Sequence, residues 1–170
     1  MNKTATFYQS PIGKIFINYT DDIIVSLLFE KENDQQQTEE IVGNEPPLPH
    51  ALLNKCLLQL QEYFEGNRKE FDLPVQQNGT AFQQKIWYAL TQIPYGKTMS
   101  YLELSKRTGD AKAIRAVGTT NGKNQLSIVV PCHRVIGSNG TLTGYGGGLW
   151  RKQWLLEHEA KFAHGVQTLF

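Results

Sequence analysis

A thiol and an imidazole stand next to each other in the run Pro131-Cys132-His133-Arg134. The thiolate form of cysteine is a strong nucleophile, and neighbouring basic side chains favour that form. Most lone cysteines are small buried hydrophobic residues, so the pair alone is not decisive. Cys132, however, follows a proline, precedes His133 and Arg134, and lies beside a glycine-rich segment, 137–148, that could admit a substrate. These features together predict that Cys132 is a reactive nucleophile.

The second cysteine, Cys56, has none of these features. It lies between Lys55 and Leu57 in an apolar stripe with helical spacing, and we expect it to be structural. Two cysteines can form neither a disulfide framework nor a four-cysteine zinc site. We also expect no metal and no cofactor.

The imidazole of His133 needs two further conditions before it can activate a thiol. Neighbouring residues on an extended strand point in opposite directions, so a turn or a bridging water must bring Cys132 and His133 together. The imidazole also needs an acceptor that orients it. Glu157 and Glu159 are the candidates, because both lie near the end of a helix that carries tryptophans. The alternative is that both are surface charges.

The second half of the chain is expected to be mainly helical. One helix is expected after a capping box at Thr80 and Gln83, and a second at Tyr101–Arg107 after a similar box at Ser100 and Glu103. A third should run from Ala111 to about Asn121, with Asp110 as its cap. The last is expected at Leu149–Glu159, with Trp150, Trp154 and Leu155 as its packing stripe. Leu126–Val130 is predicted to be a short strand that Pro131 ends, which would place Cys132 just beyond a strand end.

The two short helices, at 101–107 and 111–121, have the outline of a helix-turn-helix joined by a turn that contains Gly109. This pattern is weak alone, because many helical hairpins bind nothing. Small residues such as Ala116 would let the second helix lie close to another surface, which suits a nucleic-acid groove and close helix packing equally. Arg115 is more informative, since it has no acidic neighbour along the helix to pair with.

The N-terminal half is expected to form a small α/β unit. Its expected elements are antiparallel strands at Thr4–Tyr8, Lys14–Tyr19 and Ile23–Phe29, a loop over 30–47, a helix at Leu52–Phe64, a short strand at Phe71–Pro74 and a linker at Gln76–Gly79. In the second strand, Ile15 and Ile17 should share one face and Phe16 and Asn18 the other.

The charge is unevenly distributed. Residues 1–79 carry 6 Lys/Arg and 12 Asp/Glu, whereas residues 80–170 carry 11 and 4. A basic C-terminal half favours a polyanionic partner, although a chance asymmetry on two solvated surfaces explains the charges equally well. The first residues lack the apolar core of a signal peptide, and no apolar run is long enough to span a membrane. We therefore expect a cytoplasmic protein with no membrane association.

The stretch from Gly79 to Glu159 resembles the O6-alkylguanine-DNA alkyltransferase family. The matching runs are GTAFQ (79–83), IPYG (93–96), SY (100–101), RAVG (115–118), IVVPCHRV (128–135), GY (144–145), GG (147–148) and the segment from Leu155 to Glu159. The N-terminal half matches more loosely, through SPIG (10–13) and YFEG (63–66). The chain departs from the family pattern at Gln125, where proline is usual, and at Gly146, where some members have serine.

The resemblance implies both a fold and an activity. Residues 1–78 would form an RNase H-like α/β domain, with an antiparallel sheet plus a helix. Residues 79–170 would form a mainly α DNA-binding and alkyl-acceptor domain, with a helix-turn-helix and a short active-site strand. The activity would be direct transfer of an alkyl group from O6-alkylguanine, and from O4-alkylthymine, in double-stranded DNA to Cys132. The product is a thioether that does not regenerate the thiol, so each chain, expected to be a monomer, would act once.

The resemblance also implies roles for the matched residues. Cys132 would accept the alkyl group, His133 would deprotonate it through a water, and Glu159 would orient His133. Asn124 would connect the recognition helix, which is the second helix of the helix-turn-helix, to the active-site strand. Tyr101 would contact the backbone of the flipped nucleotide and donate a proton to the departing guanine, and Arg115 would fill the gap left in the base stack. Further DNA contacts are expected from Ser100, Lys112, Ala116 and Thr119, and the base pocket would be lined by Val135, Tyr145 and the backbone of Gly146.

Two other functions compete with this one. An alkyltransferase-like adaptor binds lesions without repairing them, but such proteins replace the cysteine, whereas Cys132 is present. A cysteine hydrolase could use a Cys–His–Glu constellation, but it would leave the helix-turn-helix and the basic half unexplained.

Overall fold

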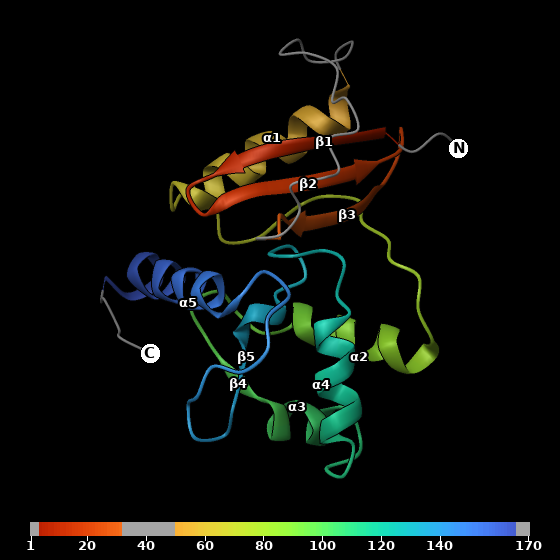
Figure 1. Cartoon of the computed structure of the whole chain (residues 1–170), viewed down its shortest axis with the longest axis vertical. Coiled ribbons are helices and arrows are strands. Elements are labelled where there is room, and N and C mark those ends of the chain that lie inside the picture. The colour runs from red at the N-terminus through yellow and green to blue at the C-terminus, as the bar shows by residue number, and fades with distance from the viewer. Residues whose placement is uncertain (1–3, 32–49, 166–170) are drawn as a thin grey trace. The chain divides into compact units, whose positions relative to one another are not determined.

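The computed structural model describes residues 4–31 and 50–165, and the chain divides into two compact units, residues 1–77 and 78–170. The first unit is a three-stranded sheet with one long helix, and the second is mostly helical (Figure 1). This architecture confirms the predicted order of an α/β unit with an antiparallel sheet followed by a mainly helical unit. The predicted loop over 30–47 lies almost entirely outside the described residues.

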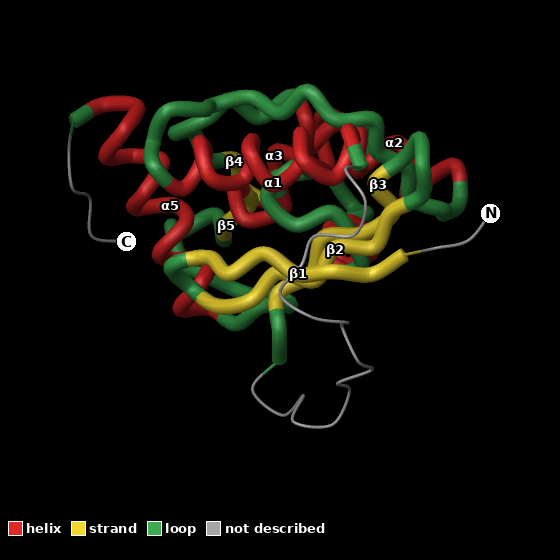
Figure 2. The backbone as a smooth tube through the Cα atoms, turned by 90° about the horizontal axis from the view of Figure 1, so that it is seen from above, coloured by secondary structure: helices red, strands yellow, loops and turns green. Residues whose placement is uncertain are grey.

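The sheet of the first unit is an antiparallel meander. Its strands are β1 (Thr4–Ser10), β2 (Gly13–Tyr19) and β3 (Ile24–Phe29), in the order β1-β2-β3. They lie side by side as the yellow strands of Figure 2. In β2, Ile15 and Ile17 are fully buried, whereas Phe16 and Asn18 are partly exposed, so the predicted alternation of faces is confirmed.

Helix α1 (Ala51–Phe64) supplies the other part of this unit's core. His50 caps it, because its Nδ1 accepts a hydrogen bond from the backbone N–H of Leu53 at 3.2 Å. The buried face of the helix includes Leu53, Cys56 and Leu60. Burial raises the pKa of the Cys56 thiol to about 12, which is the environment of a structural cysteine.

The strand predicted at Phe71–Pro74 is wrong. The backbone of Asp72 bonds instead to the side chain of Gln59 on α1, which accepts from the Asp72 N–H at 2.9 Å and donates to its carbonyl at 3.1 Å. Those backbone groups are therefore unavailable to a sheet ladder. A single parallel bridge between Val75 and Ile24 is what joins this stretch to the sheet.

The second unit is built from short elements around a core that includes Ile86, Leu90, Leu104, Val117 and Leu155. In chain order its elements are α2 (Ala81–Thr91), β4 (Met99–Ser100), α3 (Tyr101–Arg107), α4 (Ile114–Gly122), the 3-10 turn η1 (Cys132–Arg134), β5 (Val135–Ile136) and α5 (Leu149–His164). Strands β4 and β5 pair in parallel, which connects the start of α3 to the segment directly after η1.

The helix starts follow their caps, with one exception. The capping box of Thr80 and Gln83 is complete, and Ser100 accepts from the N–H of Glu103 at 3.0 Å. The helix predicted from Ala111 is wrong at its start, since α4 begins at Ile114. The Asp110 Oδ1 accepts a hydrogen bond from the N–H of Lys112 at 2.8 Å, which forms a turn instead of a helix cap.

The strand predicted at Leu126–Val130 is also wrong. The Val130 N–H donates to the Leu126 carbonyl at 2.9 Å, and the Val129 N–H donates to the Ser127 carbonyl at 2.8 Å. Ile128, between them, has a φ of 71°, which is unusual for a β-branched residue. The segment is therefore a tight turn.

The side chain of Asn124 explains this turn. Its Nδ2 donates to the Val130 carbonyl at 2.7 Å, and its Oδ1 accepts from the Leu126 N–H at 3.1 Å. One asparagine thus binds backbone groups at both ends of the segment that a strand would have used in a ladder.

Trp150 does not belong to the packing stripe of α5. It is 49% exposed, and the Arg151 guanidinium lies 4.6 Å from its ring centroid. Leu155 is fully buried as expected, and Trp154 is partly buried and stacks on His158. Trp150 lies in the first turn of the helix, directly after the glycine-rich segment.

Candidate active site

A turn places the thiol and the imidazole of the PCHR run in the same buried region. Pro131 has φ −82° and ψ 63°, and the Cys132 N–H donates to the Val130 carbonyl at 2.8 Å, which forms an inverse γ-turn. Cys132 and His133 then lie in η1, and both are buried. The turn that the sequence requires between these neighbours is therefore present, although the strand before it is not.

Glu159 is the acidic partner of His133. Its Oε1 lies 2.7 Å from the His133 Nε2, and both side chains are almost completely buried. Glu157, the other candidate, accepts from Gln153 at 2.9 Å along the helix and does not take part in this pair. Helix α5 extends past its predicted end, to His164, and so holds Glu159 within a regular helix.

Arg134 binds the same carboxylate. Its Nε donates to the Glu159 Oε2 at 2.8 Å and its Nη2 donates to Oε1 at 2.9 Å, while Nη1 donates to the Ile93 carbonyl at 2.7 Å. A bidentate arginine–carboxylate pair fixes both groups in orientation as well as in charge. Glu159 is thus held by two neighbouring residues of η1.

The electrostatics of this cluster define the tautomer of His133. Burial alone would raise the pKa of Glu159, but the contacts with His133 and Arg134 hold that pKa well below its usual range. Burial lowers the pKa of His133, against the opposing effect of Glu159, so the imidazole is neutral near pH 7. An ionised carboxylate can only accept hydrogen bonds, so the proton of the neutral imidazole is on Nε2, which donates a hydrogen bond to Glu159.

The other ring nitrogen of His133 is therefore an acceptor. Nδ1 is buried and has no hydrogen-bond partner among the described residues. A buried lone pair without a partner is costly in a protein interior. The geometry leaves this nitrogen available to take a proton.

Burial raises the pKa of the Cys132 thiol above its ordinary value. A hydrogen bond from Asn124 and the charge of Lys152 oppose this effect. The prediction that His133 and Arg134 favour the thiolate is wrong, because His133 is neutral and the charge of Arg134 is compensated by Glu159. The groups that favour the thiolate come from the segment after α4 and from α5.

Two asparagines connect the end of α4 to the nucleophile. Asn124, which the sequence analysis named, binds the turn before Cys132 as described above. Asn121, which it missed, is buried at the end of α4, and its Nδ2 donates to the Cys132 carbonyl at 3.3 Å. Asn121 also interacts with the Tyr101 hydroxyl. Sequence spacing could not reveal this contact, since it depends on the fold of the turn.

Tyr101 lies at the start of α3, and its hydroxyl donates to the Thr143 carbonyl at 3.1 Å. The same carbonyl accepts from the Lys152 Nζ at 2.9 Å. Lys152 is a second residue that the sequence analysis missed. Its position three residues before the buried Leu155 would have placed it on the inner face of α5.

The three residues predicted to line the base pocket have different environments. Val135 is fully buried in β5. The Tyr145 hydroxyl is buried, interacts with Ser127 and with Cys132, and has a pKa well above its ordinary value because of burial. A side chain added at Gly146 would meet no atom within 4 Å, so that position is open.

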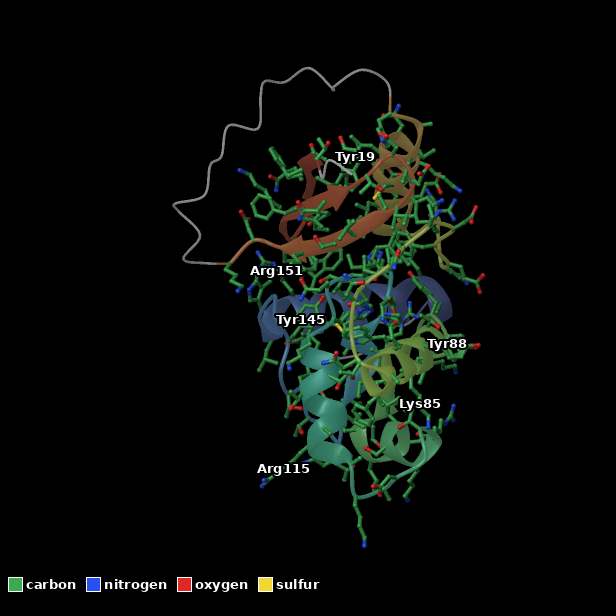
Figure 3. All side chains as sticks on the ribbon, turned by 90° about the vertical axis from the view of Figure 1, so that its right-hand side faces the viewer. Tyr19, Lys85, Tyr88, Arg115, Tyr145 and Arg151 are labelled. Atoms are coloured by element: carbon green, nitrogen blue, oxygen red, sulfur yellow. The ribbon has the colours of Figure 1, made fainter. Side chains whose placement is uncertain are left out.

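The predicted DNA-contacting residues lie mainly on the outer side of α4. Arg115, Ala116 and Thr119 are exposed, whereas Val117 and Thr120 on the opposite side are buried. Arg115 extends away from the rest of its unit in Figure 3, and none of the ion pairs in the described part of the chain involves it. Lys112 is exposed in the turn before α4, and Ser100 caps α3.

No group of three or more His, Cys, Asp or Glu side chains in residues 4–31 and 50–165 could hold a metal ion. Within the same ranges, no helix is both long enough and apolar enough to cross a bilayer.

Two family models match almost the whole chain. Residues 81–161 match the DNA-binding domain of 6-O-methylguanine DNA methyltransferase, and residues 4–77 match the ribonuclease-like domain of the same family. The constitutive methylated-DNA–protein-cysteine methyltransferase of Bacillus subtilis is 46% identical over 142 residues, which covers 84% of this chain and 86% of that protein.

Solved structures agree with these matches. The O6-methylguanine methyltransferase of Mycobacterium tuberculosis has a TM-score of 0.80 at 39% identity and covers 97% of both chains. The M. tuberculosis OGT in complex with DNA has a TM-score of 0.78 at 42% identity and covers 92% of both chains. With this fold and a buried Cys–His–Glu site, the chain is a member of the 6-O-methylguanine DNA methyltransferase family.

Proposed function

We propose that this protein repairs DNA by transferring an alkyl group from O6-alkylguanine, and from O4-alkylthymine, to Cys132 in a single turnover. The observation that carries the proposal is the buried His133–Glu159 pair, which directly follows the buried Cys132 in a member of this family. The proposed reaction requires no metal and no cofactor. A lesion-binding adaptor with the same fold would not need a cysteine at this position.

The proton path starts at the Cys132 thiol. The neutral His133 accepts the thiol proton at Nδ1 through a bridging water, and the resulting imidazolium is stabilised by its Nε2–H bond to the Glu159 carboxylate. The thiolate then attacks the alkyl carbon on O6, so that a C–S bond forms as the C–O bond breaks. The electron pair of the broken bond leaves with the guanine.

Tyr101 supplies the proton that neutralises the departing guanine. In this structure its hydroxyl donates to the Thr143 carbonyl, and we expect it to turn to the base when DNA binds. Val135, Tyr145 and the open backbone at Gly146 line the space for the base. Asn124 holds the segment before Cys132 to the end of the recognition helix.

The C-terminal unit delivers the lesion to this site. Helices α3 and α4 act as a helix-turn-helix, and the target nucleotide leaves the base stack to reach Cys132, at a cost of about a few kcal/mol. Arg115 fills the gap, while Ser100, Lys112, Ala116 and Thr119 contact the DNA backbone and groove. In this proposal residues 79–170 are the DNA-binding and alkyl-acceptor domain, residues 1–78 are the RNase H-like domain, and the protein acts as a cytoplasmic monomer.

Intact mass spectrometry tests this function. After incubation with a duplex that carries O6-methylguanine, the protein should gain the mass of a single methyl group, and peptide mapping should place it on Cys132. The Cys132→Ala variant should gain nothing, and Cys56→Ala should behave as wild type, because Cys56 is buried in the other unit. Tight binding without a mass change would indicate a lesion-binding adaptor. A mass gain from a thioester substrate alone would indicate a hydrolase.

A further inference from the structure

The run Ile93-Pro94-Tyr95-Gly96, called the IPYG turn below, forms a tight turn after α2. The Lys97 N–H donates to the Pro94 carbonyl at 3.0 Å, and Gly96, at the third position of this β-turn, has a φ of 75°. A type II turn requires a positive φ at that position, and glycine adopts it without strain. The motif therefore specifies the shape of the turn.

The IPYG turn lies directly against the last part of α5. A Cβ added at Gly96 would come within 2.5 Å of the Ala163 Cβ and within 3.4 Å of the Glu159 carbonyl oxygen. The Nε2 of His164 lies 3.3 Å from the Gly96 carbonyl, and because a carbonyl can only accept, the imidazole is the donor. The missing side chain at Gly96 thus lets the turn approach the helix, and His164 holds the two together.

From this position the turn contacts both members of the buried ion pair. The Gly96 N–H donates to the Glu159 Oε2 at 3.4 Å, and the Ile93 carbonyl accepts from the Arg134 Nη1 at 2.7 Å. The Arg134 guanidinium carbon also lies 5.7 Å from the centroid of the Tyr95 ring. A buried ion pair offsets its desolvation only when further hydrogen bonds satisfy both partners, and the turn supplies such bonds to each.

The contact with Gly96 bears on the carboxylate oxygen that faces away from the imidazole. Oε2 of Glu159 accepts from the Arg134 Nε and the Gly96 N–H, while Oε1 accepts from the Arg134 Nη2 and the His133 Nε2. A carboxylate displaced from the turn would therefore also move relative to His133. A misplacement of about 1 Å in a catalytic arrangement can lower the rate about a hundredfold.

We propose that Gly96 is a positioning residue, which lets the IPYG turn hold the Glu159 carboxylate on His133, and that His164 keeps the turn in place. The expected effect on alkyl transfer rests on the proposed function. The expected effect on the His133–Glu159 hydrogen bond does not, because that bond is present in the protein without DNA.

The test compares Gly96→Ala with the wild type in two measurements. The first is NMR of the imidazole nitrogens of the free protein, with the His133 signals assigned by their loss in His133→Gln. The wild type should show the Nε2–H tautomer alone, whereas the variant should gain the Nδ1–H tautomer because Nε2 has lost its fixed acceptor. The second is the single-turnover rate with a free O6-alkylguanine base, which should fall by about tenfold to a hundredfold.

Two further variants separate positioning from the general cost of replacing a glycine. Gly165→Ala also adds a Cβ at a positive φ, of 68°, but that Cβ would meet no atom within 4 Å. It should leave the His133 tautomer and the rate unchanged. The double variant Gly96→Ala/Ala163→Gly removes the methyl group that the new one would meet, so it should recover part of the rate and of the Nε2–H tautomer.

If Gly96→Ala does not fold by circular dichroism, variants of the exposed His164 carry the test. His164→Ala removes the donor to the Gly96 carbonyl and should change the tautomer and the rate in the same direction, although by less. His164→Gln keeps an N–H donor and should restore both.

A folded Gly96→Ala variant with an unchanged tautomer and rate would overturn the proposal. A lower melting temperature with an unchanged tautomer would also overturn it, because the turn would then be only structural, and so would an equal loss in Gly165→Ala. Failure of the proposed function has a different signature, which is that the wild-type protein gains no methyl group from damaged DNA while Gly96→Ala still changes the tautomer of His133.

Discussion

The carboxylate of Glu159 is shared by two consecutive side chains of one short turn. His133 lies 2.7 Å from its Oε1, and Arg134 binds both of its oxygens at 2.8 and 2.9 Å. The arginine keeps the carboxylate ionised, and the ionised carboxylate keeps the proton of the imidazole on Nε2. Arg134 therefore acts on the nucleophile through two neighbours, Glu159 and His133, while its own charge is paired with Glu159.

Glu159→Gln should test this arrangement directly. The variant keeps the shape of the side chain but removes the charge, so Arg134 is left as a buried cation without a counter-ion. Breaking a buried pair in this way costs about 3–5 kcal/mol of unfolding free energy. We expect a melting temperature well below wild type and a single-turnover rate reduced by about a hundredfold, in the range of general acid–base effects. Glu157→Gln is the matched control, and an equal loss in both variants would contradict the assignment.

Much of this site could be predicted from the sequence because its residues lie in short motifs. The thiol, the imidazole and Glu159 were identified from the PCHR run and the family pattern, and the meander and α1 followed from hydrophobic alternation and spacing. Asn121 and Lys152 were missed because their roles depend on burial against segments far away in the chain. The turn at Leu126–Val130 was mistaken for a strand because its apolar residues have the composition of a strand, while a side chain outside the run, Asn124, determines its shape.

The pH dependence should follow His133. Its pKa in the folded protein is below the ordinary 6.5, so the unfolded chain binds the proton more tightly. The stability that this residue contributes is present above pH 6.5 and is lost as the pH falls below that value. The transfer rate should fall in the same direction, because protonated His133 cannot accept the thiol proton. Melting curves and single-turnover rates between neutral and mildly acidic pH would check both, and a His133→Gln variant whose melting temperature keeps the same acid sensitivity would assign the effect to another group.

Asn124→Ala should destabilise the turn that precedes Cys132. The turn before Cys132 loses the bonds to the Leu126 N–H and the Val130 carbonyl, and each buried group left without a partner costs about 1–3 kcal/mol. We expect lower thermal stability and a large loss of transfer rate, with DNA affinity in a Cys132→Ala background changed little. Gln125→Ala, at the exposed neighbouring position, is the control. A rate near that of wild type for Asn124→Ala would show that the turn does not need this side chain.

Arg115→Ala should separate DNA handling from chemistry. Arg115 is exposed on α4, so its removal should not disturb the Cys132 site. Repair of O6-methylguanine in duplex DNA should fall far more than reaction with the free O6-alkylguanine base. The exposed Lys123, at the other end of the same helix, offers Lys123→Ala as a comparison for the simple loss of a positive charge. Equal losses on duplex and free base in Arg115→Ala would contradict its role in the base stack.

The central claim is that Cys132 accepts the alkyl group itself and keeps it. The most direct measurement is the amount of guanine restored per chain when wild-type protein meets a large excess of O6-methylguanine duplex. The account predicts that repair stops when each chain has acted once, with every chain then carrying a methyl thioether on Cys132. Repair that continues well past one equivalent, or that leaves Cys132 unmodified, would contradict it.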